Sequence, residues 1–240
     1  VLIQTEYMVN GYFYEHILKY LLSDNKNNEV INPTIRSKII YGVAAIMNRL
    51  HKNNIMHIGL LKQIYLDERF EPKIQLTNLS FMINKTLEQK IEIGNTTQAD
   101  FILPFISSPE FVTDDEPSFS SDVFAFAFFL YLMFVPNIKM GSKVFKLNSK
   151  DSNTMGHLFY NYIQSGERPP LSESIPDEYK NLIQKCWCHE PLCRPTFEQI
   201  VEELRNDKFA LTEFGMETDL DELHSYRERI DKDVDEGLSQ

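Results

Sequence analysis

The side chains with the clearest chemical potential are three cysteines and a histidine that lie close together: Cys186, Cys188, His189 and Cys193. Thiolates and imidazoles are the ligands that zinc prefers, so a structural zinc site is one hypothesis for this cluster. The spacing argues against it, because Cys-x-Cys is cramped and the paired Cys-x-x-Cys pattern is missing. We therefore expect no metal here, and reduced thiols beside a core tryptophan, Trp187.

The charge of the chain limits the partners that it can bind. The net charge is −11, from 24 basic and 35 acidic residues. Residues 211–240 alone carry ten acidic and three basic side chains, a net charge of −7. An acidic chain without a basic stripe binds nucleic acid and anionic membranes poorly. With no signal peptide or membrane-spanning segment in the sequence, we expect a cytoplasmic location and a protein partner.

One stretch must lie at the centre of the fold. Residues 123–135 (VFAFAFFLYLMFV) are all apolar, which predicts a helix that is buried on every side. The stretch is well short of the roughly 20 residues that span a bilayer. Ser120, Ser121 or Asp122 could serve as the N-cap, and Pro136 cannot continue the helix. The alternative is a buried strand, which the length and the alanines of the stretch disfavour.

The remaining elements are mostly helices. Asn32-Pro33 is a typical helix start, and apolar residues then recur at three- and four-residue steps until about residues 51–54. The other predicted elements are strands at 1–8, 64–66 and 72–76, helices at 12–22, 154–164, 176–187 and 196–204, and a long irregular segment at 79–109. We expect an α+β fold, mainly α, in one domain over residues 1–208, followed by a partly helical acidic tail over residues 209–240.

Seven short motifs follow one another along the chain: residues 3–11 (IQTEYMVNG), 50–57 (LHKNNIMH), 66–67 (LD) with 72–74 (PKI), 108–110 (SPE), 121–127 (SDVFAFA), 185–187 (KCW) and 194–197 (RPTF). In this order they resemble the C-terminal lobe of the protein kinase family, in a form similar to its tyrosine-kinase-like group. The resemblance implies a kinase C-lobe built around the buried helix. No glycine-rich phosphate loop precedes Val1, so we expect the N-lobe to be absent from this chain.

Kinases use ATP and magnesium, and the resemblance shows where their catalytic residues would stand. The family pattern His-Arg-Asp-Leu-Lys-x-x-Asn falls on residues 57–64, which read HIGLLKQI. The catalytic aspartate is then replaced by Gly59, and the magnesium-binding asparagine by Ile64, or by Gln63 if the loop is one residue shorter. The magnesium-binding aspartate of Asp-Phe-Gly is replaced by Leu76. None of these positions carries a carboxylate, so we expect no catalytic, cofactor-binding or metal-binding residue in this chain.

The structural residues of the family are present, by contrast. The resemblance implies that Glu110 and Arg194 form a buried ion pair, and that Trp187 belongs to the closing helices. It also implies that Asp122 accepts backbone N–H groups from the catalytic loop, although the residue would serve equally well as a helix N-cap. His57 matches a position with a packing role.

These observations predict a kinase-like domain that is catalytically inactive, a pseudokinase that acts as a scaffold or regulator in signalling. One alternative is an active kinase that uses displaced carboxylates such as Asp67 or Glu71. Another is an interaction module in which an amphipathic tail helix binds a groove of a partner through one face, which carries Leu220, Leu223, Tyr226 and Ile230. The tail helix could equally pack on its own domain. The oligomeric state cannot be read from the sequence.

Overall fold

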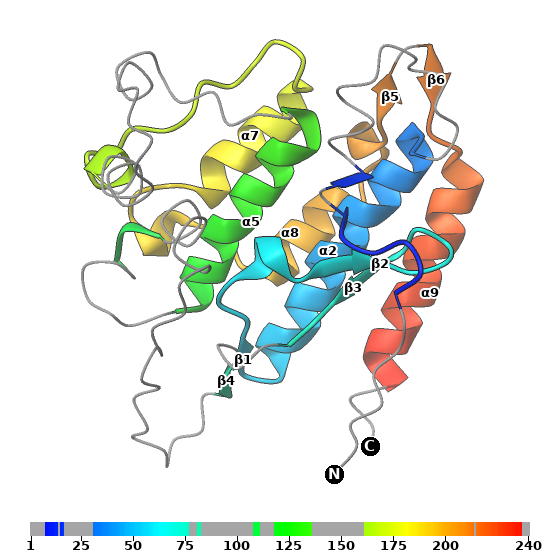
Figure 1. Cartoon of the computed structure of the whole chain (residues 1–240), viewed down its shortest axis with the longest axis horizontal. Coiled ribbons are helices and arrows are strands. Elements are labelled where there is room, and N and C mark those ends of the chain that lie inside the picture. Colours follow the sequence, from blue (N-terminus) through cyan, green and yellow to red (C-terminus); the bar gives the residue numbers. More distant parts are fainter. Residues whose placement is uncertain are drawn as a thin grey trace. The chain divides into compact units, whose positions relative to one another are not determined.

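The computed structural model describes residues 8–13, 15–16, 31–76, 81–82, 108–110, 118–135, 161–213 and 215–236 (Figure 1). The chain divides into two compact units. Unit 1 consists of Val1–Arg49, Lys62–Leu76 and Phe197–Gln240, and unit 2 of Leu50–Leu61 and Thr77–Thr196. Among the described residues helices predominate, with three two-stranded sheets. This composition agrees with the α+β class predicted from the sequence.

Helix α2 (Pro33–Lys52) is the longest element of the described chain and belongs to unit 1 as far as Arg49. It begins as the sequence predicts, because the Asn32 side chain accepts the backbone N–H of Ile35 at 2.9 Å and Pro33 occupies the first helical position. Most of its first fifteen residues are buried, including the charged residues Arg36 and Lys38.

The antiparallel strands β2 (Ile64–Leu66) and β3 (Pro72–Ile74) form a hairpin in unit 1. Both were predicted, but β3 is two residues shorter than the predicted strand 72–76. After Ile74, the backbone N–H of Gln75 still donates to Gln63 O at 2.9 Å, and Leu76 is then half exposed, at 52%.

The C-terminal part of unit 1 contains α8 (Phe197–Leu204), the 3₁₀ helix η4 (Asp207–Phe209), the strands β5 (Thr212–Glu213) and β6 (Met216–Glu217), and α9 (Leu220–Glu236). The predicted helix 196–204 corresponds to α8, and α9 is the helical part of the tail predicted over residues 209–240, whereas the short hairpin β5–β6 was not predicted. Figure 1 shows α9 beside α2, and side chains join the two helices: Tyr41 Oη donates to Asp231 at 2.8 Å and Lys38 Nζ to Glu222 at 2.9 Å.

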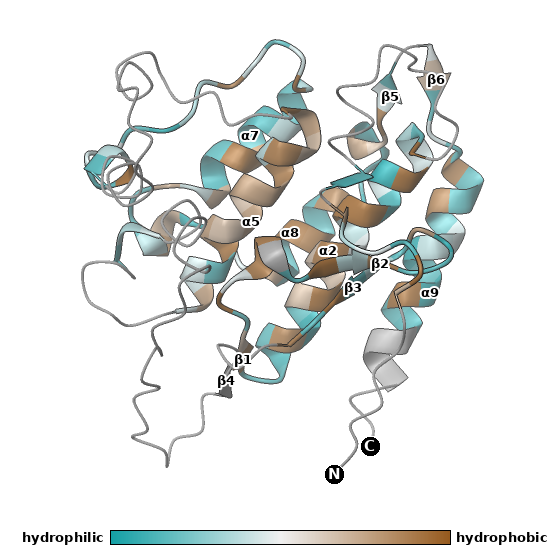
Figure 2. Ribbon diagram, viewed as in Figure 1, coloured by the Kyte–Doolittle hydropathy of each residue, from teal (hydrophilic) through white to brown (hydrophobic). Residues whose placement is uncertain are grey.

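In unit 2, helix α5 (Phe119–Phe134) is buried along its whole length from Asp122 onward, and it packs against α7 (Asp177–Cys186). Figure 2 shows this as a run of hydrophobic residues along α5. The predicted apolar helix is therefore present. The 3₁₀ helix η3 (Pro191–Cys193) follows α7, and β1 (Ile55–Met56) pairs with β4 (Phe81–Met82) in a two-stranded sheet that was not predicted.

The predicted N-cap of α5 was wrong. The cap is Ser118, whose hydroxyl accepts the backbone N–H of Ser121, while the Ser121 hydroxyl accepts the backbone N–H of Ser118, both at 3.2 Å. This reciprocal pair is a capping box, which satisfies two backbone donors at once. Ser121 and Asp122 consequently lie inside the first turn, with their side chains available for contacts elsewhere.

Several predicted elements lie outside the described residues. They are the strand 1–8 apart from Met8, most of the helix 12–22, the irregular segment 79–109 apart from β4 and residues 108–109, and the first part of the helix 154–164. Residues 161–164 are helical, as predicted. The described helices include none that is both long and apolar enough to cross a membrane.

Candidate functional site

In unit 2, the loop that follows β1 is held by Asp122 at the start of α5. The two carboxylate oxygens of Asp122 accept the backbone N–H groups of His57 at 2.8 Å and Ile58 at 2.9 Å. His51 Nε2 donates to the same carboxylate at 3.1 Å. Asp122 and His57 are both buried. Three hydrogen bonds to one buried carboxylate fix the course of the loop.

The backbone of this loop has unusual dihedral angles. Ile58 has a φ of +48° and Gly59 a φ of +120°. A β-branched residue with positive φ is an outlier that the surrounding structure must hold in place. Gly59 tolerates its φ because it has no Cβ. There is open space around Gly59, since an added Cβ would meet no atom within 4 Å. Backbone strain, and not crowding, therefore opposes any side chain at this position.

The positions that the family resemblance assigned to magnesium binding carry no carboxylate. In unit 1, Ile64 is completely buried in β2, and its side chain is a hydrocarbon. Gln63 precedes it, with a neutral amide, and Leu76 after β3 presents a hydrocarbon to solvent. Magnesium prefers carboxylate, carbonyl and water oxygens in octahedral geometry. The hydrocarbon side chains of Ile64 and Leu76 thus do not fit this metal, and Gln63 offers a single neutral oxygen.

The two carboxylates that could replace the missing ones have other partners. Asp67 Oδ1 accepts the backbone N–H groups of Arg69 and Glu71, each at 2.9 Å, and so shapes the turn between β2 and β3. Glu71 is buried and its carboxylate lies 2.5 Å from Arg229 Nη2 of α9 and 3.9 Å from Lys38 Nζ of α2. Both carboxylates are thus committed to structure within unit 1.

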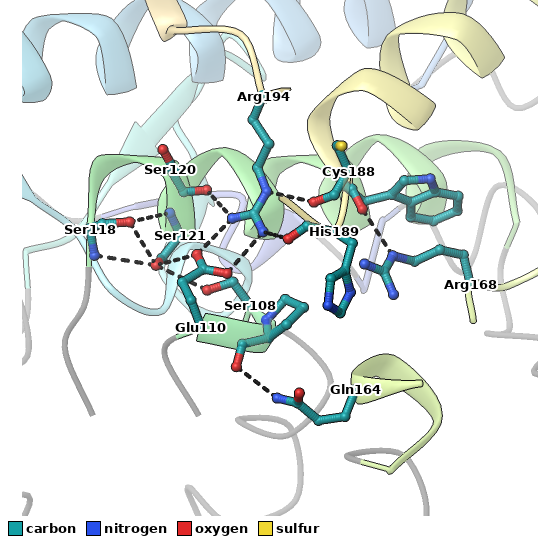
Figure 3. A network of polar contacts seen from close by, with 12 residues as sticks. Ser108, Glu110, Ser118, Ser120, Ser121, Gln164, Arg168, Cys188, His189 and Arg194 are labelled. Atoms are coloured by element: carbon teal, nitrogen blue, oxygen red, sulfur yellow. Dashed lines mark hydrogen bonds and ion pairs between the residues drawn. The ribbon is translucent and has the colours of Figure 1, made fainter. Parts of the chain in front are cut away.

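Glu110 and Arg194 lie together in unit 2, as the sequence predicted (Figure 3). Arg194 Nη1 is 2.7 Å from Glu110 Oε1 and Nη2 is 2.9 Å from Oε2, so the contact is bidentate. The other three N–H groups of the guanidinium donate to backbone carbonyls of Cys188, His189 and Ser120 at 2.8–3.0 Å. All five donors of Arg194 have acceptors, and its side chain is fully buried.

The charge of Arg194 controls the ionisation of Glu110. Burial alone raises the pKa of the Glu110 carboxyl, but the hydrogen bonds from Arg194 and Ser108 and the charge of Arg194 outweigh burial and hold the pKa below its ordinary value. The Ser121 hydroxyl, which also caps α5, donates to Glu110 Oε1 at 3.1 Å. The start of α5 is thereby connected to the ion pair.

A second arginine lies near this pair and was not predicted. Arg168 donates from Nε to the Trp187 carbonyl at 2.9 Å, and burial lowers the pKa of its guanidinium to about 10, helped by the charge of Arg194. The guanidinium carbons of Arg168 and Arg194 lie 5.0 and 4.9 Å from the centre of the Phe124 ring, which is within cation–π range. Trp187 in turn contacts Phe128 of α5, with ring centres 5.7 Å apart. The sequence around Arg168, Arg-Pro-Pro after Glu167, predicts a turn but does not indicate the contacts of the arginine side chain.

The cysteine cluster of the sequence is spread over different environments. Cys186 is buried in α7, Cys188 is half-buried, and Cys193 is exposed at the end of η3. Within the described part of the chain, no three His, Cys, Asp or Glu side chains are arranged to hold a metal ion.

Comparison with known proteins agrees with this arrangement. A family model described as "protein tyrosine and serine/threonine kinase" matches residues 1–204. The chain belongs to the protein kinase family. The matched range includes Glu110, Arg194 and Asp122, and also Gly59 and Leu76.

Individual relatives are protein kinases of larger size. A probable serine/threonine-protein kinase of Dictyostelium discoideum is 32% identical over 68% of this chain, and a dual specificity protein kinase of the same organism is 29% identical over 85%. A serine/threonine-protein kinase of Arabidopsis thaliana is 24% identical over 84%. The matched regions span 16%, 8% and 31% of these three proteins.

Proposed function

We propose that this kinase domain is catalytically inactive and acts as a scaffold or regulator in signalling, through a protein partner. The observation that carries the proposal is the set of side chains at the family's catalytic positions: Gly59, Ile64 or Gln63, and Leu76. Phosphoryl transfer depends on a carboxylate that orients the substrate hydroxyl and on carboxylate and amide oxygens that hold magnesium. The hydrogen atom of Gly59 and the hydrocarbon side chains of Ile64 and Leu76 supply neither, and Gln63 would supply one neutral amide oxygen without a carboxylate.

The contacts of Asp122 and of the Glu110–Arg194 pair favour a domain that is folded and functional over one that has lost its function. Asp122 still fixes the loop that carries Gly59, and Glu110 still binds Arg194 through two hydrogen bonds. Loss of one partner of a buried ion pair strongly destabilises a fold. The intact pair therefore supports a domain that is folded and can present a binding surface.

The alternative of an active kinase with displaced residues has little support. Asp67 and Glu71 are the carboxylates nearest in sequence to the missing ones, and each is held by backbone N–H groups or by cations of unit 1. Catalytic side chains must be held within roughly 0.5 Å of the productive geometry. To reach such a geometry, Asp67 and Glu71 would first have to break these contacts.

The alternative of a tail that binds a partner groove also has little support in its original form. Leu223 and Tyr226 of the apolar face of α9 are buried within the chain, whereas Leu220 is 41% exposed. A partner would therefore meet Leu220 and the exposed polar face of the tail.

We propose that residues 1–208 form a kinase C-lobe around α5 and that residues 209–240 form the tail. We also propose that the protein is cytoplasmic, and that the positions at Gly59, Gln63, Ile64 and Leu76 engage neither ATP nor magnesium.

The proposal is tested by a phosphotransfer assay of the purified chain with radiolabelled ATP, magnesium and generic protein substrates. We expect no incorporation above that of a heat-denatured sample. Incorporation that needs magnesium and is abolished by Asp67→Asn would overturn the proposal. Incorporation that Asp67→Asn leaves unchanged would point to a contaminating kinase, which repurification to constant specific activity would remove.

Restoring the catalytic aspartate is a second test. Gly59→Asp should not produce activity, because φ is +120° at Gly59 and an aspartate there costs about 1–3 kcal/mol of backbone strain. Gly59→Ala is the matched control, since it carries the same strain without a carboxylate. Equal losses of stability in the two variants, without turnover in either, are the expected result, and turnover in Gly59→Asp alone would contradict it.

A further inference from the structure

One exposed hydroxyl group of helix α9 lies among charged side chains. Ser225 is exposed, and its hydroxyl donates to the Asp221 carbonyl at 2.8 Å. Residues three and four positions apart lie on the same face of a helix. The residues at these distances from Ser225 are all exposed: Asp221, Glu222, Glu228 and Arg229. The hydroxyl is thus accessible to solvent, on a face with three carboxylates and one guanidinium.

The arginine of this face joins α9 to the β2–β3 hairpin. Arg229 Nη2 lies 2.5 Å from Oε1 of Glu71, the buried residue that precedes β3. Lys38 Nζ of α2 lies 3.9 Å from the same oxygen. The Arg229 side chain is 43% exposed and that of Lys38 is 8% exposed. Of the two cations that neutralise Glu71, the arginine is therefore the one that a second anion on the surface of α9 can reach.

We propose that Ser225 is a phosphorylation site for an acidophilic serine/threonine kinase, and that the phosphate draws Arg229 away from Glu71. Kinases select their substrates by the charge pattern around the acceptor, and residues 219–228 carry four acidic side chains and one arginine. The Ser225 oxygen forms a bond to the γ-phosphorus of ATP as the bond to ADP breaks, and the hydroxyl proton passes to a carboxylate of that kinase. Local opening of α9 presents the segment to the enzyme.

The phosphate would compete with Glu71 for the arginine. It would stand one turn before Arg229, in the order that favours an acid N-terminal to a base, and it would carry about two negative charges. Because Ser225 and Arg229 both belong to α9, a detached helix would keep this new pair, whereas the attached helix would have to give up either the phosphate or Glu71. Phosphorylation would therefore loosen the attachment of the tail to the hairpin.

Repulsion acts in the same direction. Asp221, Glu222 and Glu228 share the face of Ser225, so a phosphate there would face three like charges. The inference extends the proposed role as a regulator, but it uses none of the residues at the catalytic positions, and a phosphotransfer activity of this chain would leave it unaffected.

Treatment of the whole chain with casein kinase II and ATP tests the site. We expect a product heavier by about 80 Da, with the phosphate mapped to Ser225 in the tail peptide. Ser225→Ala should lose this modified peptide. Ser174→Ala is the matched control, since Ser174 is another exposed serine with an aspartate three positions later, and it should keep the modified tail peptide. Absence of phosphate from Ser225 in the wild type would overturn the proposal.

Charge variants test the competition for Arg229 separately. Ser225→Glu places a carboxylate on the helix, and Ser225→Gln has the same shape without the charge. We expect the amides of residues 220–232 to exchange with solvent about twofold to fivefold faster in Ser225→Glu, the change that corresponds to an exposed ion pair. The difference should shrink when Arg229→Ala is added to both variants. Equal exchange in Ser225→Glu and Ser225→Gln, or a difference that Arg229→Ala leaves undiminished, would refute the competition.

Discussion

At the scale of single residues, Arg194 is a side chain in which every donor has an acceptor. Its five N–H groups bind the Glu110 carboxylate and the carbonyls of Ser120, Cys188 and His189, which come from three segments of unit 2. A lysine has three donors on a point charge and could not reproduce a bidentate contact to Glu110. The position therefore requires arginine for geometric reasons, and not for charge alone.

Replacing Arg194 with alanine should lower the free energy of unfolding by about 3–5 kcal/mol, because the change leaves the Glu110 carboxylate and three carbonyls without their donor. Urea unfolding of the two proteins at neutral pH measures the difference. Lys180→Ala is the matched control in the same unit, since Lys180 pairs with an exposed carboxylate, that of Asp177, and such pairs contribute at most about 1 kcal/mol. Similar losses in both variants would show that Arg194 is an ordinary surface residue.

The stability that Glu110 provides should depend on pH in a defined direction. A carboxyl whose pKa is lower in the folded state stabilises the fold above its unfolded pKa, about 4.3, and this contribution is lost as the pH falls through the folded pKa. We expect the stability gap between wild type and Glu110→Gln to be largest at neutral pH and to shrink below about pH 4. Urea unfolding at pH 7, 5, 4 and 3 checks this, and a gap that stays constant with pH would contradict it.

At the scale of elements, the contact between α9 and α2 depends on a glycine. A Cβ added to Gly42 of α2 would lie 2.2 Å from Tyr226 Oη of α9 and 2.6 Å from Cγ of Pro72. Lys38 Nζ and the Arg229 guanidinium lie over the Tyr226 ring, each 5.3 Å from its centre. Only glycine lets the tyrosine approach α2 this closely.

Gly42→Ala should displace α9 and lower the unfolding free energy by about 1–3 kcal/mol, the usual cost of overpacking. Faster hydrogen exchange in residues 220–232 would locate the effect. Tyr226→Phe should cost little by comparison, since the Tyr226 hydroxyl is buried and makes no hydrogen bond to a described residue. In Gly42→Ala/Tyr226→Phe part of the clash is removed, so the double variant should be more stable than Gly42→Ala. Additive effects of the two changes would argue against the contact.

Some features of the helices and strands could be predicted from the sequence and others could not. The start of α2 and the burial of α5 were predictable because Asn32-Pro33 and an unbroken apolar run are local signals. The cap of α5 was misplaced because several hydroxyl and carboxylate residues precede the helix, and only the reciprocal bonds of Ser118 and Ser121 distinguish them. Sheets of two residues per strand, such as β1–β4, have too few residues to show any alternation.

The site was predictable only through the family resemblance. Glu110 and Arg194 are separated by 84 positions, and no local pattern links residues so far apart. Arg168 was missed for the same reason, because its role depends on the Trp187 carbonyl and the Phe124 ring, both distant in sequence. The absence of carboxylates at Gly59 and Leu76, on the other hand, could be read directly once the motifs were aligned.

At the scale of the whole molecule, the tail is part of unit 1 and should be required for its stability. Leu211, Leu223 and Tyr226 are buried, and the Arg227 guanidinium binds the carbonyls of Leu204 and Arg205 at the end of α8. Each buried apolar side chain contributes about 1.5–3 kcal/mol. The surface that the tail offers to a partner therefore consists of Leu220 and the polar face of α9.

A chain that ends at Ala210 should be less stable than the full chain by about 4 kcal/mol or more, from the three side chains alone. Urea or thermal unfolding measures the loss. Glu228→Gln, a change on the exposed face of α9, is the control and should leave the unfolding midpoint unchanged. An unchanged midpoint after truncation would instead support an independent tail that binds a partner.

The burial of α5 has a consequence for how the protein is made. The helix ends at Phe134, and its packing partner α7 is complete only at Cys186, about fifty residues later. At a synthesis rate of about 5–20 residues per second, these residues take roughly 3–10 s to emerge. During that interval the apolar surface of α5 has no α7 to cover it on the ribosome. Production of this chain should accordingly depend on chaperones that bind nascent polypeptides, and lowering the growth temperature should raise its soluble yield.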